Sequence, residues 1–156
     1  MVANSYIRLI LFSVFFFFNY KFIYVMENLA QEINLDKAFS LYKDRSLLII
    51  DVRTKKEWKM TGVIPNSILI NMHDDNNLER ESFVEEVKFE LDSNKNKNIA
   101  FICASGSRSE AVMSFFSNKG YKNVFHIPNG IMGHQNDGWL FQGFPITNYH
   151  TKKETK

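Results

Sequence analysis

Hydrophobic and polar positions follow two patterns along the chain, one typical of buried strands and one typical of amphipathic helices. Short, largely apolar runs at residues 47–52, 98–103 and 124–127 are too short for helices and predict strands with both faces buried. A further short strand is expected at 67–71, after the turn that Pro65 favours.

Between these strands, apolar residues recur every three or four positions. This spacing predicts helices at 35–43, 79–93 and 109–119, with one or two helical turns at 55–60. Asn34 can cap the first helix. The apolar faces are assigned to Leu35, Ala38, Phe39 and Tyr42 in the first helix, to Phe83, Val84, Val87, Phe89 and Leu91 in the second, and to Ala111, Val112, Phe115 and Phe116 in the third.

Strands that alternate with helices predict an α/β fold, with a small, mostly parallel sheet and helices on both of its faces. In such folds ligands bind at the carboxyl ends of the strands. Asp51 and Cys103 both stand at strand ends of this kind. We therefore expect the functional site at that edge of the sheet.

The composition indicates one globular domain. The chain has 156 residues, of which 45% are hydrophobic, 15% aromatic and 23% charged. We place the domain at residues 26–150, followed by a charged tail at 151–156. The 19 Lys and Arg exceed the 17 Asp and Glu by two, and Arg8 and Lys21 account for this excess. Because the rest of the chain is balanced and has no basic cluster, nucleic-acid binding is not expected.

Residues 1–25 form a separate hydrophobic segment with an apolar run from Leu9 to Phe18. The run is shorter than the roughly 20 residues of a spanning helix, and no pair of small residues marks a cleavage site after it. Three interpretations remain open: a membrane tether with contact through residues 7–25, a signal peptide, or a start assigned too early, with Met26 as the true first residue. For the domain itself we expect a cytoplasmic location.

Cys103 is the single cysteine, so no disulfide can form within the chain, and four scattered histidines do not complete a Cys/His zinc site. We expect neither a metal nor a cofactor. The residues that follow Cys103 are small or basic and lead into a helix; they are Ala104, Ser105, Gly106, Ser107, Arg108 and Ser109.

A loop of this composition can turn its backbone amides towards its centre, and the helix that follows adds the positive end of its dipole. Gly106 permits a positive φ within the loop, and the three serines offer hydroxyl donors. We expect the amides and the guanidinium of Arg108 to stabilise Cys103 as a thiolate, the nucleophilic form of cysteine. The alternative is an inert, buried cysteine before an ordinary polar turn.

Two motifs, in this order, resemble those of the single-domain rhodanese family over about residues 33–146. The first joins Asp51-Val52-Arg53, Glu57-Trp58 and the GVIPNS sequence of residues 62–67, and is similar to the family's D-V-R-x-x-x-E-W/F and G-H/V-I-P-G-A/S. The second, CASGSRS at 103–109, is similar to its C-x-x-G-x-R-S active-site loop. Asn66 and Asn129 stand where the family usually has glycine, and the loop that carries His134 is longer than usual.

The resemblance implies a sulfurtransferase. Cys103 would take the outer sulfur of a small anionic donor such as thiosulfate, hold it as a persulfide, and pass it to cyanide, a thiol or a protein thiol. The amides of residues 104–109 would cradle the persulfide, and Arg108 would help to hold the donor. Asp51 and Arg53 are expected to support the site, through a salt bridge or hydrogen bonds with Glu57 and its neighbours, rather than to touch substrate.

Three other functions fit parts of the pattern. Rhodanese-like phosphatases also use a loop cysteine and an arginine, but their loop has five residues between the two, whereas four separate Cys103 from Arg108. A non-catalytic recognition domain and a carrier that exchanges sulfur only with partner proteins both remain open.

Overall fold

The structure is a computed structural model that describes residues 31–74 and 76–150. The predicted hydrophobic segment at 1–25 and the charged tail at 151–156 lie outside the described residues. Along the chain the elements are α2 (Leu35–Lys43), β1 (Leu47–Asp51), α3 (Lys55–Thr61), β2 (Ile68–Leu69), α4 (Phe83–Ser93), β3 (Asn98–Ile102), α5 (Ser107–Asn118) and β4 (Val124–His126).

The four strands form one sheet in the order β2-β1-β3-β4, and every pair of neighbours is parallel. Strand β1 is central, with Ile50 paired to Ile68 on one side and to Phe101 on the other. Four of the five residues of β1 are buried and Leu48 is partly buried, because helices or loops cover both faces of the sheet. The predicted α/β fold with a parallel sheet is confirmed.

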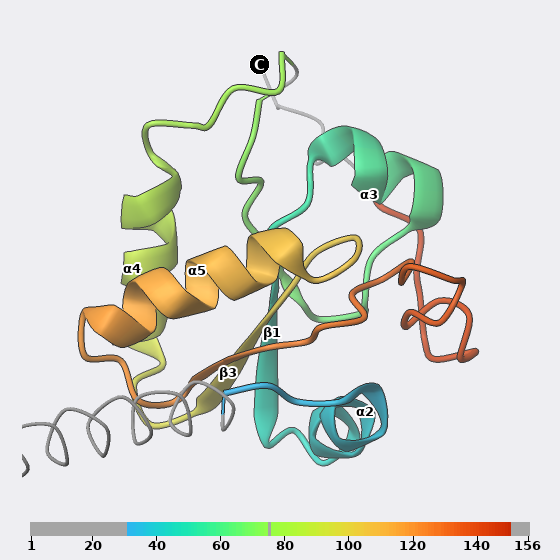
Figure 1. Cartoon of the computed structure of the whole chain (residues 1–156), viewed down its shortest axis with the longest axis horizontal. Helices are drawn as coiled ribbons and strands as arrows, with labels where there is room; N and C mark the ends of the chain where they lie inside the picture. Colours follow the sequence, from blue (N-terminus) through green and yellow to red (C-terminus); the bar gives the residue numbers. More distant parts are fainter. Residues whose placement is uncertain (1–30, 75, 151–156) are drawn as a thin grey trace, which may run out of the picture. The chain divides into compact units, whose positions relative to one another are not determined.

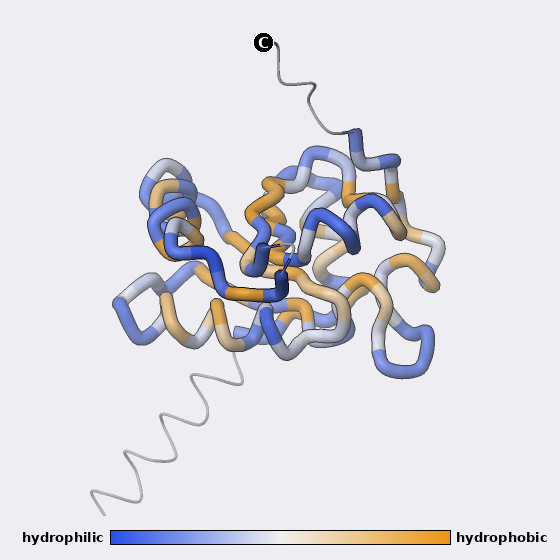
Figure 2. Tube along the Cα trace, turned by 90° about the horizontal axis from the view of Figure 1, so that it is seen from above, coloured by the Kyte–Doolittle hydropathy of each residue, from blue (hydrophilic) through white to orange (hydrophobic). Residues whose placement is uncertain are grey.

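Each face of the sheet has its own hydrophobic core. On one face, α4 and α5 pack against Ile50, Ile99 and Phe101. On the other face, α2 and the irregular segment 127–146 pack against Ile49 and Ile102. Figure 1 shows α4 and α5 together beside the strands, with α2 apart from them. In Figure 2 hydrophobic and hydrophilic stretches alternate along the trace.

The first helix agrees with its prediction, since Asn34 Oδ1 accepts a hydrogen bond from the Lys37 amide at 2.9 Å and caps α2. Strand β2 is shorter than the predicted 67–71. Helix α4 begins at Phe83 rather than at 79, because Glu79 pairs with His73 in an isolated antiparallel bridge and the Arg80 amide donates to the Met72 carbonyl at 3.0 Å.

Two predicted apolar faces are wrong in part. Phe89 is 69% exposed and Phe115 is 42% exposed, and Ala111 is exposed as well. In α4 the buried positions are spaced four apart, so Phe89 points away from them. In α5 the buried face includes the polar Ser109, which a pattern of apolar residues does not select. The buried residues are Phe83, Val87 and Leu91 in α4, and Ser109, Val112, Met113 and Phe116 in α5.

Within residues 31–74 and 76–150, none of the helices combines the length and the apolar character that crossing a bilayer requires.

The burial of α4 generates a stability prediction. Leu91 is 1% exposed, so Leu91→Ala removes packed methyl groups and leaves a cavity. We expect it to lower the free energy of unfolding by about 2–4 kcal/mol. Phe89→Ala, on the same helix, is expected to change it by less than about 0.5 kcal/mol. Urea unfolding of the two variants measures both values, and equal losses would contradict the assigned face.

Candidate active site

The parallel sheet brings the two predicted strand-end residues to the same edge. Asp51 is the last residue of β1, and Cys103 directly follows β3. Asp51 is paired with Ile102 across these neighbouring strands, so Asp51 and Cys103 stand one position apart along the edge. The candidate site is therefore built at the carboxyl end of the sheet, as expected for this fold class.

The Cys103 sulfur lies inside the loop that follows it. The Gly106 amide donates to Cys103 Sγ at 3.2 Å, and Ser109 Oγ lies 3.6 Å from the same sulfur. The Ser109 hydroxyl also donates to the Gly106 carbonyl at 2.8 Å, which is the better geometry for its one proton. Cys103 is 1% exposed, and Ser109 is buried. The sulfur thus faces a donor-lined loop that little solvent reaches.

The backbone behind the loop fixes the direction in which the loop amides point. The Cys103 carbonyl accepts the Ile131 amide at 2.8 Å, and the Ala104 carbonyl accepts the amides of Met132 and Gly133 at 2.8 and 3.2 Å. These carbonyls are therefore turned towards segment 130–133. In the part of the chain that the structure describes, five amides of the loop and the helix start have no protein acceptor; they belong to Ala104, Ser105, Ser107, Arg108 and Ser109.

Unpaired amides at the start of a helix can stabilise an anion, and the Gly106 amide already donates to the Cys103 sulfur. Helix α5 begins at Ser107, two residues earlier than predicted, so its first free amides belong to the loop itself. Ser107 is exposed, whereas Ala104, Ser105 and Arg108 are partly buried. Of the predicted loop residues, Gly106 and Ser109 contact the Cys103 sulfur.

Two glycines make this packing possible. Gly106 has φ +102°, and a Cβ there would lie 2.1 Å from the Pro128 carbonyl oxygen. Gly130 has φ +61°, and a Cβ there would lie 2.5 Å from the Ala104 oxygen and 2.6 Å from the Cys103 oxygen. A side chain at either position would push the loop away from its support.

Arg108 does not lie free beside the sulfur. Its guanidinium binds both carboxylate oxygens of Glu57, with Nη1 to Oε2 at 2.9 Å and Nη2 to Oε1 at 2.6 Å. Thr54 holds the same carboxylate, because its amide and hydroxyl each donate to Oε2 at 2.8 Å. This pair joins α3 to the start of α5, and it neutralises the charge of Arg108.

Electrostatics at this pair favour the charged forms. Burial raises the pKa of Glu57, but the hydrogen bonds from Arg108 and Thr54 outweigh it and lower the pKa from 4.5 to about 2. The hydrogen bond to Glu57 in turn raises the pKa of Arg108. The contact between Glu57 and Arg108 was not expected from the sequence. The feature that could have indicated it is the T-x-x-E capping box at Thr54, which marks a helix start and fixes the direction of Glu57.

Asp51 and Arg53 form a buried ion pair with each other. Arg53 Nη2 lies 2.7 Å from Asp51 Oδ2, and the two side chains are 1% and 0% exposed. The remaining guanidinium donors of Arg53 reach Thr61 Oγ1 at 2.6 Å and the Gly62 carbonyl at 2.8 Å. Neither residue is bonded to Glu57. The pair ties the end of β1 to the end of α3, which is the helix that carries Glu57.

The longer loop after β4 carries His134. This residue is exposed, and its amide donates to Asp137 Oδ1 at 3.0 Å. Among residues 31–74 and 76–150, His, Cys, Asp and Glu side chains nowhere gather in threes as a metal site would need.

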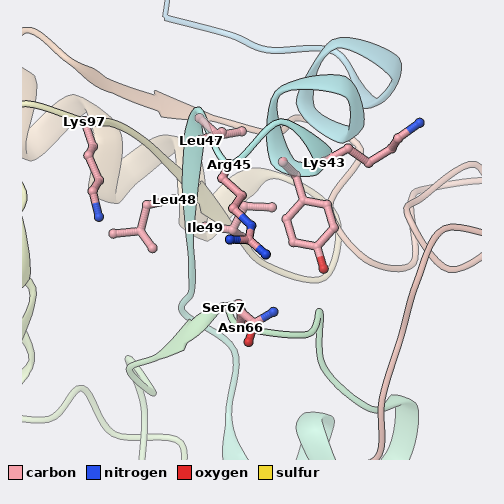
Figure 3. Close-up of a pocket in the computed structure, with 9 residues that line it drawn as sticks. Lys43, Arg45, Leu47, Leu48, Ile49, Asn66, Ser67 and Lys97 are labelled. Atoms are coloured by element: carbon pink, nitrogen blue, oxygen red, sulfur yellow. The ribbon is translucent and has the colours of Figure 1, made fainter.

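A cavity of about 540 Å³ lies at the opposite edge of the sheet from Cys103. It opens at the amino ends of β1 and β3, between Leu47 and Lys97. Figure 3 shows the Arg45 side chain pointing towards Asn66 and Ser67, while the Lys43 ammonium points outwards. Because Cys103 follows the carboxyl end of β3, this cavity takes no part in the chemistry of the cysteine loop.

A model of the Rhodanese-like domain matches residues 34–137. The chain belongs to this family. It is 32% identical over 124 residues to Uncharacterized protein RP600 of Rickettsia prowazekii (strain Madrid E), covering 75% of this chain and 97% of that protein. The rhodanese resemblance of the two motifs is thereby confirmed.

Two further proteins are similar to this chain, one in sequence and one in fold. The chain is 33% identical over 105 residues to the tRNA uridine(34) hydroxylase of Prochlorococcus marinus (strain MIT 9515), covering 62% of this chain and 31% of that protein. The crystal structure of a thiosulfate sulfurtransferase from Pseudomonas aeruginosa superposes with a TM-score of 0.58 at 21% identity, covering 81% of this chain and 23% of that one. This second likeness shows the fold alone.

The close approach at Gly130 generates a prediction. Gly130→Ala places a methyl group against the Cys103 and Ala104 carbonyls in addition to straining a positive φ, so we expect the free energy of unfolding to fall by about 2–4 kcal/mol. Gly143→Ala is the matched control, because Gly143 has φ +71° and open space around a Cβ. We expect that variant to lose about 1 kcal/mol. Thermal or urea unfolding compares the two, and equal losses would argue against the tight support of the loop.

The Glu57 pair generates a pH-dependent prediction. Because the folded pKa of Glu57 is about 2 and its ordinary value is 4.5, its stabilising contribution is present above pH 4.5 and is lost as the pH falls towards 2. We expect Glu57→Gln to lower the free energy of unfolding by about 1–2 kcal/mol at neutral pH, a range discounted for partial exposure. The difference between the two proteins should shrink as the pH falls below 4.5.

Urea unfolding of the wild-type protein and the Glu57→Gln variant at a series of pH values measures this difference. The control is Glu85→Gln on the exposed surface of α4, which should change the free energy of unfolding by less than about 0.5 kcal/mol at neutral pH. A Glu57→Gln difference that stays constant down to acid pH would contradict the assigned ion pair.

Proposed function

We propose that this rhodanese-like protein is a sulfurtransferase that carries a sulfur atom as a persulfide on Cys103. The observation that carries the proposal is the amide cradle: Gly106 donates to Cys103 Sγ, and the carbonyls of the loop are turned away from the sulfur. A cradle of this kind stabilises a negative charge on the sulfur before transfer and on the persulfide after it.

The reaction has two displacement steps. The Cys103 thiolate attacks the outer sulfur of a donor such as thiosulfate, a new S–S bond forms, and sulfite leaves with the electron pair of the broken bond. A nucleophilic acceptor, either cyanide or a thiolate, then attacks the outer sulfur of the persulfide. The bond to Cys103 breaks, and Cys103 returns to the thiolate. The amides of residues 105–109 hold the charge at each stage, and no redox cofactor or metal is needed.

The ion pair of Arg108 narrows the choice of donor. Glu57 holds the guanidinium at both of its outer nitrogens, so Arg108 has less to offer an anionic donor than the sequence suggests. A dianion such as thiosulfate would depend mainly on the amides. A donor or acceptor that brings its own binding surface depends less on this one charge. This observation favours, as a second candidate, a carrier that exchanges sulfur with a partner protein through the same persulfide.

The length of the loop supports sulfur as cargo rather than phosphate. The loop needs to enclose one outer sulfur next to Cys103, and the Gly106 amide already closes on Sγ at 3.2 Å. A tetrahedral phosphate needs a wider cradle, which the extra residue of the rhodanese-like phosphatases provides. The similarity to a tRNA uridine(34) hydroxylase covers 31% of that protein, and we do not extend its activity to this chain.

Formation of the persulfide is the first prediction of this proposal. After incubation with thiosulfate or glutathione persulfide, we expect intact mass spectrometry of the protein to show a gain of one sulfur atom that cyanide removes. The Cys103→Ser variant should show no gain, because serine forms no persulfide. No gain with either donor, or an equal gain in Cys103→Ser, would overturn the proposal.

A further inference from the structure

The ion pair between Glu57 and Arg108 sets the net charge beside the Cys103 sulfur. Arg108 is the only basic residue of the cysteine loop. Both carboxylate oxygens of Glu57 bind its guanidinium, at 2.9 and 2.6 Å, so the positive charge is neutralised where it stands. The buried pair of Asp51 and Arg53 at the end of β1 is neutral as well. The sulfur therefore faces backbone amides rather than a free cation.

Arg108 is close enough to Cys103 for their charges to interact. The hydrogen bond to Glu57 is the main cause that raises the pKa of Arg108, and the charge of a Cys103 thiolate adds to the rise. The side chains of Arg108 and Glu57 are 25% and 28% exposed, so water screens them only in part. The net charge of this pair consequently acts on the sulfur and on any anion that approaches it.

Glu57 is held in place and does not simply move aside for an anion. Its Oε2 accepts the amide and the hydroxyl of Thr54, each at 2.8 Å, as well as Arg108 Nη1. Its own amide donates to the Thr54 hydroxyl at 3.3 Å, which completes the capping box. Glu57 is thus a fixed negative charge next to the loop, and releasing Arg108 to a donor would break charge-assisted hydrogen bonds.

We propose that Glu57 is a specificity-determining residue that makes the Cys103 loop disfavour small dianionic sulfur donors such as thiosulfate relative to donors of lower charge. This inference rests on the proposed persulfide of Cys103. With Glu57 ionised, a dianion gains little net attraction from Arg108 and meets a carboxylate beside it. A donor with one charge is penalised less, because the Coulomb energy is proportional to the charge of the donor.

Two donors that differ by one charge test this inference. Thiosulfate is a dianion and methanethiosulfonate is a monoanion. With either donor the Cys103 thiolate bonds to the outer sulfur, and sulfite or methanesulfinate leaves with the electron pair of the broken S–S bond. The second-order rate of persulfide formation in the full-length protein is followed by intact mass spectrometry, for the wild type and for Glu57→Gln.

We expect Glu57→Gln to form the persulfide about tenfold faster with thiosulfate and about threefold faster with methanethiosulfonate at low salt, since doubling the charge of the donor squares the factor. Both gains should shrink at high salt, because salt screens the charges.

Two control variants separate the charge of Glu57 from its structural role. Glu57→Asp keeps the negative charge but shortens the side chain, and it should stay within about twofold of the wild-type rate with each donor. A role limited to holding α3 in place would instead make Glu57→Asp and Glu57→Gln alike. Glu85→Gln makes the same change of net charge as Glu57→Gln at an exposed position of α4, and it should also stay within about twofold.

Alkylation of Cys103, the only thiol of the chain, measures the same charge without a sulfur donor. Iodoacetate is an anion and iodoacetamide is a neutral reagent of similar size; with each, the Cys103 thiolate forms a thioether and iodide leaves. We expect the ratio of the iodoacetate rate to the iodoacetamide rate to rise about threefold in Glu57→Gln and to keep its wild-type value in the two control variants.

The outcomes distinguish this inference from the proposed function. If neither donor forms a persulfide on the wild type or on Glu57→Gln, the proposed function fails and the inference fails with it. If the persulfide forms but Glu57→Gln changes the rates with both donors equally, or leaves the alkylation ratio unchanged, the persulfide stands and Glu57 does not determine the choice of donor. A larger gain with thiosulfate than with methanethiosulfonate, together with a higher alkylation ratio, supports the inference.

Discussion

The chemistry of the site depends on where the carbonyls of Cys103 and Ala104 point. A peptide group presents its N–H and its C=O in opposite directions, so a loop can offer amides to a sulfur only if its carbonyls find hydrogen-bond donors elsewhere. Here the amides of residues 131–133 supply those partners at 2.8–3.2 Å. The irregular segment after β4 is thus part of the site although it contributes no side chain to it, and Gly130 is required because the two backbones touch.

The contact between Glu57 and Arg108 at the cysteine loop depends on the position of α3. The buried Asp51–Arg53 pair extends to Thr61 and Gly62, and so fixes the end of α3 to the end of β1. Breaking a buried, hydrogen-bonded ion pair by removing one partner costs about 3–5 kcal/mol, so this end of the helix has little freedom. With α3 fixed, the capping box at Thr54 directs Glu57 towards Arg108. Asp51 and Arg53, which the sequence motif predicts as supporting residues, therefore influence the sulfur only indirectly, through the position of α3.

The fold and the cysteine loop could be predicted from the sequence because both depend on local patterns. Strand runs, the cap at Asn34 and the small residues after Cys103 each specify their own conformation within a few positions. The partner of Arg108 could not be predicted, since Glu57 reaches it only after α3 has been placed by tertiary contacts. The exposed Phe89 and Phe115 were misassigned for a related reason: hydrophobicity alone does not reveal which side of a helix a neighbour covers, and in α5 the covered side includes the polar Ser109.

These constraints leave the cysteine loop itself nearly neutral, because its one basic residue is paired with Glu57. If Cys103 carries a persulfide as proposed, selectivity between acceptors would come from the residues around the loop rather than from the charge of Arg108. The backbone amides would hold any sulfur-bearing anion in the same way, so the residues around the loop could vary without disturbing the cradle.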